Sequence, residues 1–382
     1  RSTISCVIFR ECKTRRPTLG EDMLELRNVS KVVSGETHID DVSLRLEPGS
    51  LNVLLGPTLA GKTSLMRLMA GLDRPTSGSV WMEGEDVTGI PVQKRSVAMV
   101  YQQFINYPAM SVYENIASPL RVAGLEKRVI EEKVRQAADL LHLTPHLGRT
   151  PLELSGGQQQ RTALARAMVK EARLVLLDEP LANLDYKLRE ELRAELPKIF
   201  AASGAIFVYA TTEPSEALLL GGNTATLSQG RLTQFGPTID VFRKPVDLVT
   251  ARTFSDPPLN TVSVSKAGGH FSLDNTVQLP VPQGHESAPD GPYTLGFQPH
   301  HLSLAPREPN AVCVRASVSV TEITGSESFV HLDFAGHRWV MLEEGIHRLE
   351  VGETVDVFID TRHMLVFDKA NRRVTTGNSR AA

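Results

Sequence analysis

The stretch LNVLLGPTLAGKTSL, residues 51–65, decides the fold of this 382-residue chain. It begins with a short apolar run at 51–55, which is typical of a buried strand in a parallel sheet. The spacing G-x-x-x-x-G-K-T follows at once at 56–63, and a helical pattern starts at Ser64. Glycines let successive backbone N–H groups curl around an anion, and the start of a helix adds its positive end. The sequence therefore predicts a strand, a phosphate loop and a helix in the Walker A pattern.

This loop predicts that a nucleotide binds through its phosphates. Lys62 would neutralise the β- and γ-phosphates, and the Thr63 hydroxyl would ligate Mg²⁺. Leu59 stands where related loops often carry glycine, although the pattern does not require glycine there. An accidental glycine-rich turn is the alternative, and the flanking strand and helix argue against it. We expect ATP to contact the whole loop, which consists of Gly56, Pro57, Thr58, Leu59, Ala60, Gly61, Lys62, Thr63 and Ser64.

A second motif, LVLLDE at residues 174–179, places two carboxylates after an apolar run. Ligands of open α/β sheets bind outside the carboxyl ends of the strands, where Asp178 would lie. Asp178 would hold Mg²⁺ through water, and Glu179 would act as the general base toward the attacking water. Such a run is weak evidence by itself. Beside a Walker A loop, it predicts a nucleotide-hydrolysing site of the Walker B type.

The motif LSGGQ at residues 154–158 opens a predicted helix that runs to about residue 171. Ser155 is a good N-cap, and the two glycines expose N–H groups that favour an anion. Taken alone, the motif is also compatible with an ordinary helix cap. Together with both Walker motifs in this order, residues 24–235 resemble the ATP-binding cassette family. In that family this signature binds the γ-phosphate of ATP held by the opposite subunit. The resemblance therefore implies a dimer that sandwiches two ATP molecules, and it assigns nucleotide contacts to Ser155, Gly156, Gly157 and Gln158.

Three further site positions follow from the resemblance. Gln102 corresponds to the glutamine that touches Mg²⁺ and the attacking water in this family. Asp185 belongs to a segment that resembles the D-loop, which crosses the dimer interface. Val33 stands where related importers usually place an aromatic residue that stacks on adenine. A valine offers the base only modest apolar contact.

Thr212 occupies the position of the switch histidine of this family. A histidine there donates to the γ-phosphate and steadies the attacking water. Threonine is shorter and has no titratable nitrogen. In one interpretation the chain hydrolyses ATP more slowly, with Glu179 as its base. In the other, its own site is regulatory and it works beside a different cassette subunit, whose active site its intact signature completes.

The sequence predicts an α/β P-loop NTPase domain with a helical subdomain, followed by an all-β domain. We interpret residues 1–22 as a non-native or disordered extension, because a regular pattern begins only at Met23. The nucleotide-binding domain would span 23–236. Beyond it, at 237–382, short alternating segments are separated by Gly, Pro and Asp, which favours a small barrel or sandwich.

The segment GFQPHHL, residues 296–302, resembles part of the C-terminal domain of sugar-importer ATPases of the maltose type. Those domains are small oligonucleotide-binding-like (OB-like) β-barrels with a regulatory role. The family usually has Arg-Pro-Glu-His here, so Gln298 and His300 are departures. The resemblance implies an importer ATPase for a sugar, polyol or glycerol-type solute.

An importer ATPase implies several partners at the membrane. They are transmembrane permease subunits, a second cassette subunit in a homo- or heterodimer and, indirectly, a solute-binding protein. The chain would lie on the cytoplasmic face of the inner membrane as a peripheral subunit. In this family the permease contact follows the glutamine loop, here at residues 104–115. Tyr107 and Met110 would help to form a groove for a short partner helix, the alternative being that they pack in the helical subdomain.

Composition excludes several other classes of protein. Lysine and arginine number 41 against 44 acidic residues, and the net charge of −3 argues against a nucleic-acid partner. Three cysteines without a CxxC pair predict neither a disulfide framework nor a zinc site, which favours a reducing compartment. The long heptad repeats of chromosome-maintenance cassettes and the second cassette of translation-associated ones are absent from the sequence. A nucleotide-binding partner without hydrolysis remains open, favoured by Thr212 and opposed by Glu179.

Overall fold

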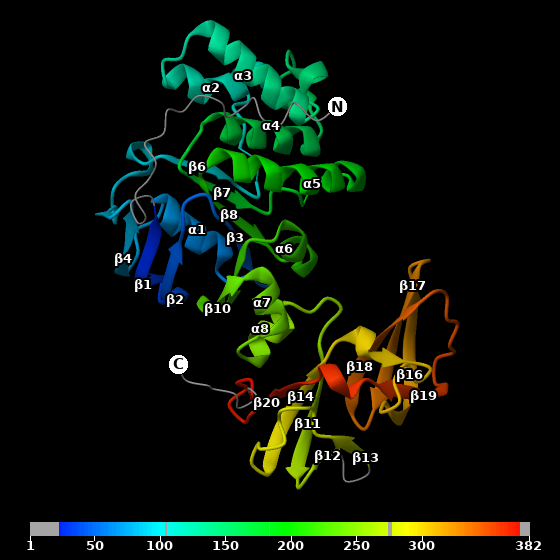
Figure 1. Ribbon diagram of the computed structural model, residues 1–382. Helices are drawn as coiled ribbons and strands as arrows, with labels where there is room; N and C mark the ends of the chain where they lie inside the picture. Colours follow the sequence, from blue (N-terminus) through cyan, green and yellow to red (C-terminus); the bar gives the residue numbers. More distant parts are fainter. Residues whose placement is uncertain (1–22, 104, 183, 274–276, 375–382) are drawn as a thin grey trace. The chain divides into compact units, whose positions relative to one another are not determined.

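The computed structural model describes residues 23–103, 105–182, 184–273 and 277–374. The chain divides into two compact units, one ending at Val241 and the other beginning at Phe242 (Figure 1). The boundary predicted after residue 236 lies a few residues before this division. The extension predicted at 1–22 lies outside the described residues.

The first unit contains two sheets that meet over one core. A four-stranded antiparallel sheet has the order β2-β1-β4-β5, formed by β1 (Leu24–Val33), β2 (Glu36–Leu46), β4 (Ser77–Met82) and β5 (Glu85–Asp86). A six-stranded sheet has the order β10-β9-β3-β8-β7-β6, formed by β3 (Leu51–Leu55), β6 (Val97–Val100), β7 (Leu174–Asp178), β8 (Ile206–Thr211), β9 (Asn223–Ser228) and β10 (Arg231–Pro237).

Parallel pairing in the six-stranded sheet determines where the polar residues gather. Strand β3 pairs in parallel with β8 and with β9, and β7 pairs in parallel with β8 and β6. Their carboxyl ends therefore share one edge of the sheet. Leu55, Asp178 and Thr211 are the last residues of β3, β7 and β8, so the segments that follow these strands start side by side.

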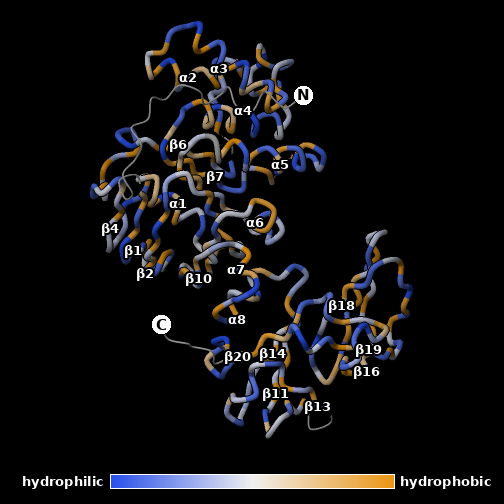
Figure 2. Tube along the Cα trace, viewed as in Figure 1, coloured by the Kyte–Doolittle hydropathy of each residue, from blue (hydrophilic) through white to orange (hydrophobic). Residues whose placement is uncertain are grey.

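Helices cover these sheets and build the predicted helical subdomain, which comprises α2, α3 and α4. The helices of the first unit are α1 (Lys62–Ala70), α2 (Val112–Val122), α3 (Lys127–Leu140), α4 (Gly156–Val169), α5 (Tyr186–Ser203) and α6 (Pro214–Leu220). Ser155 caps α4 as predicted. Helix α2 lies in a segment for which no helix was predicted. Figure 2 shows α3 with alternating hydrophilic and hydrophobic stretches, which is typical of a helix with one buried face.

The core of the first unit lies around α1. Buried residues of α1, including Leu65, Met66 and Met69, join apolar side chains of both sheets, such as Leu26 and Leu176, in one cluster. Fully burying a side chain of this kind stabilises a fold by about 1.5–3 kcal/mol. Because α1 begins directly after the loop at 56–61, this packing also holds the phosphate loop against the sheet.

Helix α7 (Thr238–Arg243) crosses the division, and α8 (Leu248–Thr253) opens the second unit. The rest of this unit is built from strands, as the sequence predicted. One five-stranded sheet, in the order β13-β12-β11-β14-β20, contains β11 (Asn260–Ala267), β12 (His270–Leu273), β13 (Val277–Pro280), β14 (Gly291–Phe297) and β20 (Leu365–Phe367). The other, in the order β15-β19-β16-β17-β18, contains β15 (Leu302–Ser303), β16 (Val312–Ile323), β17 (Glu327–Phe334), β18 (His337–Glu344) and β19 (Thr354–Ile359).

Both sheets of this unit contribute to one large apolar core. Trp339 of β18 is fully buried there and meets Phe297 of β14 edge-on, with ring centroids 5.2 Å apart. A loop rich in proline and glycine, residues 281–290, joins β13 to β14. Among the described residues, no helix of either unit is long and apolar enough to cross a membrane.

Candidate functional site

The phosphate loop lies between the end of β3 and the start of α1. Gly61 has a φ of 102°, in the left-handed region where residues with a Cβ are strained. At Gly56 a Cβ would come within 2.4 Å of the Leu227 carbonyl oxygen. Both glycines of the predicted pattern are therefore required by backbone geometry, and the loop can turn its N–H groups toward an anion.

Lys62 is a buried cation at the first turn of α1. Its side chain is 7% exposed, and its Nζ donates to the carbonyl oxygens of Gly56 at 2.7 Å and Pro57 at 3.1 Å. Burial lowers the pKa of Lys62, and the carboxylates of Glu179 and Asp178 oppose this shift. A buried ammonium group is stabilised by an anion. The observed contacts therefore fit the predicted binding of phosphate oxygens.

Thr63 and Asp178 meet across the sheet edge. The Thr63 hydroxyl donates to Asp178 Oδ2 at 2.7 Å, although the two residues are 115 positions apart in sequence. Burial raises the pKa of Asp178, and the hydrogen bond from Thr63 and the charge of Lys62 oppose the shift. A hydroxyl and a carboxylate are oxygen ligands that Mg²⁺ prefers, so the residues present fit the predicted metal.

Glu179 follows β7 in an unusual backbone conformation. Its φ is 46°, in the left-handed region, and its N–H donates to the Ala210 carbonyl of β8 at 3.0 Å. The Gln102 side-chain amide donates to Glu179 Oε2 at 3.0 Å, and Lys62 Nζ lies 3.9 Å from Oε1. Burial raises the pKa of Glu179, with Lys62 opposing. A carboxylate held in this way can accept a proton from water at the cavity wall.

Lys62, Thr63, Gln102 and Glu179 line one cavity of about 540 Å³. The predicted site residues Gly56, Pro57 and Asp178 are not among its lining residues. Thr212, predicted at the switch position, also lines it, directly after the end of β8. The cavity is lined by Thr58, Leu59, Ala60, Gly61, Lys62, Thr63 and Ser64 of the loop, by Gln102, Glu179 and Thr212, and by Glu36, Thr37, His38, Gln229 and Gly230.

Sequence reasoning missed the last of these groups. Glu36, Thr37 and His38 belong to β2, and residues 229–230 form the turn between β9 and β10. Neither segment carries a local motif, because only the pairing of distant strands brings them to the loop. Val33 is not among the residues that line the cavity, and its side chain is 41% exposed at the end of β1. Its contact with a base stays a prediction.

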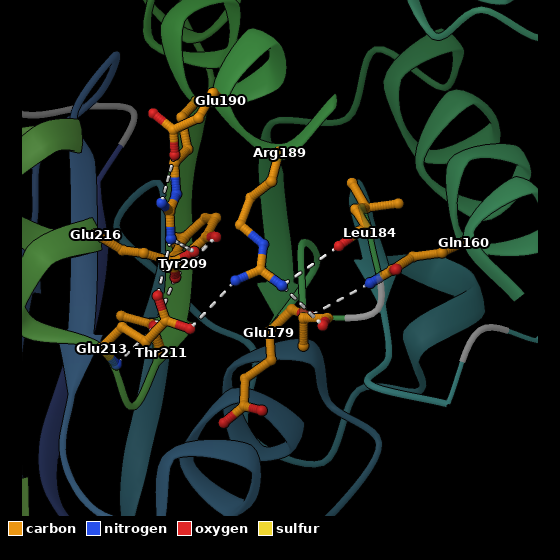
Figure 3. Close-up of polar contacts among 11 residues, drawn as sticks. Gln160, Glu179, Leu184, Arg189, Glu190, Tyr209, Thr211, Glu213 and Glu216 are labelled. Atoms are coloured by element: carbon orange, nitrogen blue, oxygen red, sulfur yellow. Dashed lines mark hydrogen bonds and ion pairs between the residues drawn. The ribbon is translucent and has the colours of Figure 1, made fainter. Parts of the chain in front are cut away.

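The signature residues lie at the start of α4 and outside the lining of this cavity. The Ser155 hydroxyl accepts from the Gln158 N–H, and Gln158 Oε1 accepts from the Ser155 N–H at 3.0 Å, so that the pair forms a capping box. From the next turn, Gln160 donates to the Glu179 carbonyl at 3.4 Å (Figure 3). The signature helix thus contacts the residue predicted as the base.

The predicted D-loop segment ends at the N-terminus of α5. Asp185 is the N-cap, and its side chain accepts from the Leu188 N–H at 3.0 Å. Asn183 of this segment lies outside the described residues, as does Phe104 of the predicted permease contact. The contact of Asp185 and the signature residues with a nucleotide stays a prediction.

Known proteins resemble the chain over most of its length. The ABC transporter family model matches residues 39–182, and the TOBE domain model matches residues 267–367. The sn-glycerol-3-phosphate import ATP-binding protein of Pectobacterium atrosepticum is 34% identical, over 90% of this chain and 97% of that protein. The trehalose/maltose import ATP-binding protein of Thermococcus litoralis is 36% identical, over 93% of this chain and 99% of that protein.

A solved structure resembles the first unit. It is a dimeric ATP-binding cassette in a post-hydrolysis state bound to ADP and Pi, with 25% identity and a TM-score of 0.52. The similarity covers 56% of this chain and 98% of that one.

Proposed function

The chain belongs to the ATP-binding cassette transporter family, and from this membership we propose that it drives uptake of a sugar, polyol or glycerol-type solute. It is an ATPase subunit, and its cassette domain binds ATP. The observation that carries the proposal is one cavity lined by Lys62, Thr63 and the Gln102–Glu179 pair, with Asp178 hydrogen-bonded to Thr63. Relatives similar over nearly their whole length import glycerol 3-phosphate or trehalose and maltose, according to their names.

Each of these residues has a role that follows from its position. The loop N–H groups and Lys62 would bind the β- and γ-phosphates and hold them in line for attack. Gln102 orients the Glu179 carboxylate, which would accept a proton as the water oxygen bonds to the γ-phosphorus and the bond to the β-phosphate oxygen breaks. Thr63, Asp178 and Gln102 would hold Mg²⁺, which supplies charge neutralisation when bound.

A second cassette subunit would complete the site. The signature residues 155–158 do not line the cavity at this chain's own phosphate loop. This supports their use by a partner. The dimeric cassette with similar structure supports the same arrangement. We propose a dimer in which ATP binding closes the two cassettes and hydrolysis reopens them.

A permease subunit would bind at the segment predicted at 104–115, on the cytoplasmic face of the membrane. Ile105, Tyr107 and Met110 are exposed, which supports a groove rather than core packing of the helical subdomain. The backbone beneath them is held by Asn115, whose side chain bonds the Tyr107 N–H at 2.8 Å and carbonyl at 3.1 Å and the Met110 carbonyl at 3.0 Å. A rigid apolar surface of this kind suits the short helix of a partner.

Steady-state Mg-ATPase activity of the full chain tests this function. Wild-type turnover that the Glu179→Gln variant loses, while both bind ATP equally, would support it. Thr212→His tests the switch position, because an imidazole could reach further toward the γ-phosphate. Negligible wild-type turnover with intact ATP binding, restored by Thr212→His, would instead indicate a hydrolysis-impaired partner subunit.

A further inference from the structure

A network of charged side chains that the mechanism above does not use lies next in sequence to Thr212 of the cavity wall (Figure 3). It joins α5, the segment after β8 and the start of α6. Two arginines of α5, Arg189 and Arg193, face two glutamates at the start of α6. Glu213 is the N-cap of this helix, and Glu216 lies in its first turn. Thr212, which lines the cavity, is the residue directly before Glu213.

The deeper half of the network fixes the end of β8. The Arg193 guanidinium, 12% exposed, donates to Glu213 Oε2 at 2.8 Å and Glu216 Oε1 at 2.9 Å. Glu216 Oε2 in turn accepts from the Thr211 hydroxyl at 2.6 Å and the Tyr209 hydroxyl at 3.1 Å. Arg193 and Glu216 thereby connect α5 with the end of β8, next to the cavity.

The same contacts enclose Thr212 from both sides. The Thr211 hydroxyl, while donating to Glu216, accepts from the Glu213 N–H at 3.0 Å. The Glu213 carboxylate is then held by Arg193 and lies 3.7 Å from Arg189 Nη1. The position of Thr212 at the cavity wall is therefore determined by groups outside the cavity.

Arg189 extends this network to the D-loop segment. Its Nη2 donates to the carbonyl oxygens of Ala182 at 3.2 Å and Leu184 at 3.4 Å, while its Nη1 faces Glu213. One planar guanidinium thus contacts the segment at 182–185 and the residue next to Thr212. A lysine has no such fork of donors and could serve only part of these contacts.

We propose that Arg189 is a positioning residue for ATP hydrolysis, which links the D-loop segment to Thr212 through Glu213. The inference rests on the proposed function, because it requires turnover at this site. A threonine at 212 has a short side chain, so its hydroxyl depends on the loop's position to meet the attacking water. Misplacing a group by about 1 Å can cost about 100-fold in rate.

A purely structural role for Arg189 would leave a different signature. The Arg189 and Glu213 side chains are 24% and 43% exposed, and their contact is long. Exposed pairs contribute little to stability. The hydrogen bonds from Arg189 to the Ala182 and Leu184 carbonyl oxygens are also long, at 3.2 and 3.4 Å. Loss of all three contacts should therefore change the unfolding temperature little, so a rate loss would report on position.

The test compares Arg189→Ala, Arg189→Lys, Glu213→Gln and the double variant Arg189→Ala/Glu213→Gln in the full chain. Turnover, the KM for ATP, equilibrium binding of a fluorescent ATP analogue and the unfolding temperature are measured for each. Arg135→Ala, which breaks the exposed Arg135–Glu131 pair of α3, is the matched control. We expect Arg189→Ala to lower kcat about tenfold or more without changing KM, nucleotide binding or unfolding temperature.

Arg189→Lys should recover part of kcat, and the double variant should be no slower than Arg189→Ala, because both changes break one connection. Unchanged kcat in Arg189→Ala would overturn the proposal. So would independent, multiplying losses in the double variant, or a kcat loss that follows a lower unfolding temperature. A wild-type chain without turnover would overturn the proposed function and, with it, this inference.

Discussion

Replacing Glu216 by alanine should unfold the first unit at a markedly lower temperature. Glu216 is 5% exposed and accepts hydrogen bonds from Arg193, Tyr209 and Thr211. Tyr209 is fully buried and Thr211 nearly so. Alanine at 216 leaves both hydroxyls in the core without this acceptor, whereas Arg193 keeps its contacts with Glu190 and Glu213.

The magnitude follows from these contacts. A buried donor that loses its acceptor costs about 1–3 kcal/mol, so the two hydroxyls together cost about 4 kcal/mol. The partly compensated Arg193 adds roughly 1 kcal/mol more. In a unit of this size 1 kcal/mol corresponds to about 2–4 °C, so we expect the unfolding temperature to fall by roughly 10–20 °C.

Differential scanning calorimetry of the full chain measures this change. The transition of the first unit is identified as the one that ATP shifts upward, because ligand that binds only the folded state stabilises it. Glu216→Gln retains an acceptor oxygen and should lower the temperature by about half as much. Glu131→Gln, in an exposed pair of α3, is the control. A Glu216→Ala shift no larger than that control would refute the role assigned to the network.

Three other outcomes follow from the structure. Lys62→Met keeps the length of the side chain without its charge and should weaken ATP binding about 10–100-fold in an equilibrium assay, because charged hydrogen bonds contribute about 1.5–3 kcal/mol; unchanged affinity would contradict the phosphate contact. Tyr107→Ala with Met110→Ala should lower solute uptake in vesicles reconstituted with the permease and leave ATP binding unchanged, and full uptake would count against the groove. Burial and the neighbouring His300 and His363 lower the pKa of His301 to about 4. Since the fold favours neutral His301, the second unit should lose on the order of 1–2 kcal/mol between pH 7 and 5, and His301→Asn should reduce this loss in urea unfolding.

The site divides into parts that the sequence predicted and parts that it did not. The phosphate loop and the strand before it, at 51–55, lie as predicted, because a glycine pattern and an apolar run act within a few residues. Asp178 likewise ends β7 as expected. The β2 residues 36–38 at the cavity were not predicted, since strand pairing alone brings them there. Helix α2 was also missed, although Ser111 and Glu114 form a capping box at its start that could have indicated it.

By itself, the sequence determined the order of the motifs, the family and the residues predicted to meet ATP. Each motif depends on local backbone geometry, which the spacing of a few neighbouring residues encodes directly. Only the tertiary structure decided that Arg189 contacts the D-loop segment and faces Glu213, that Glu216 binds the end of β8, and that Thr212 lies between them. These contacts join residues on separate elements, and the packing of α5 and α6 beside β8 creates them.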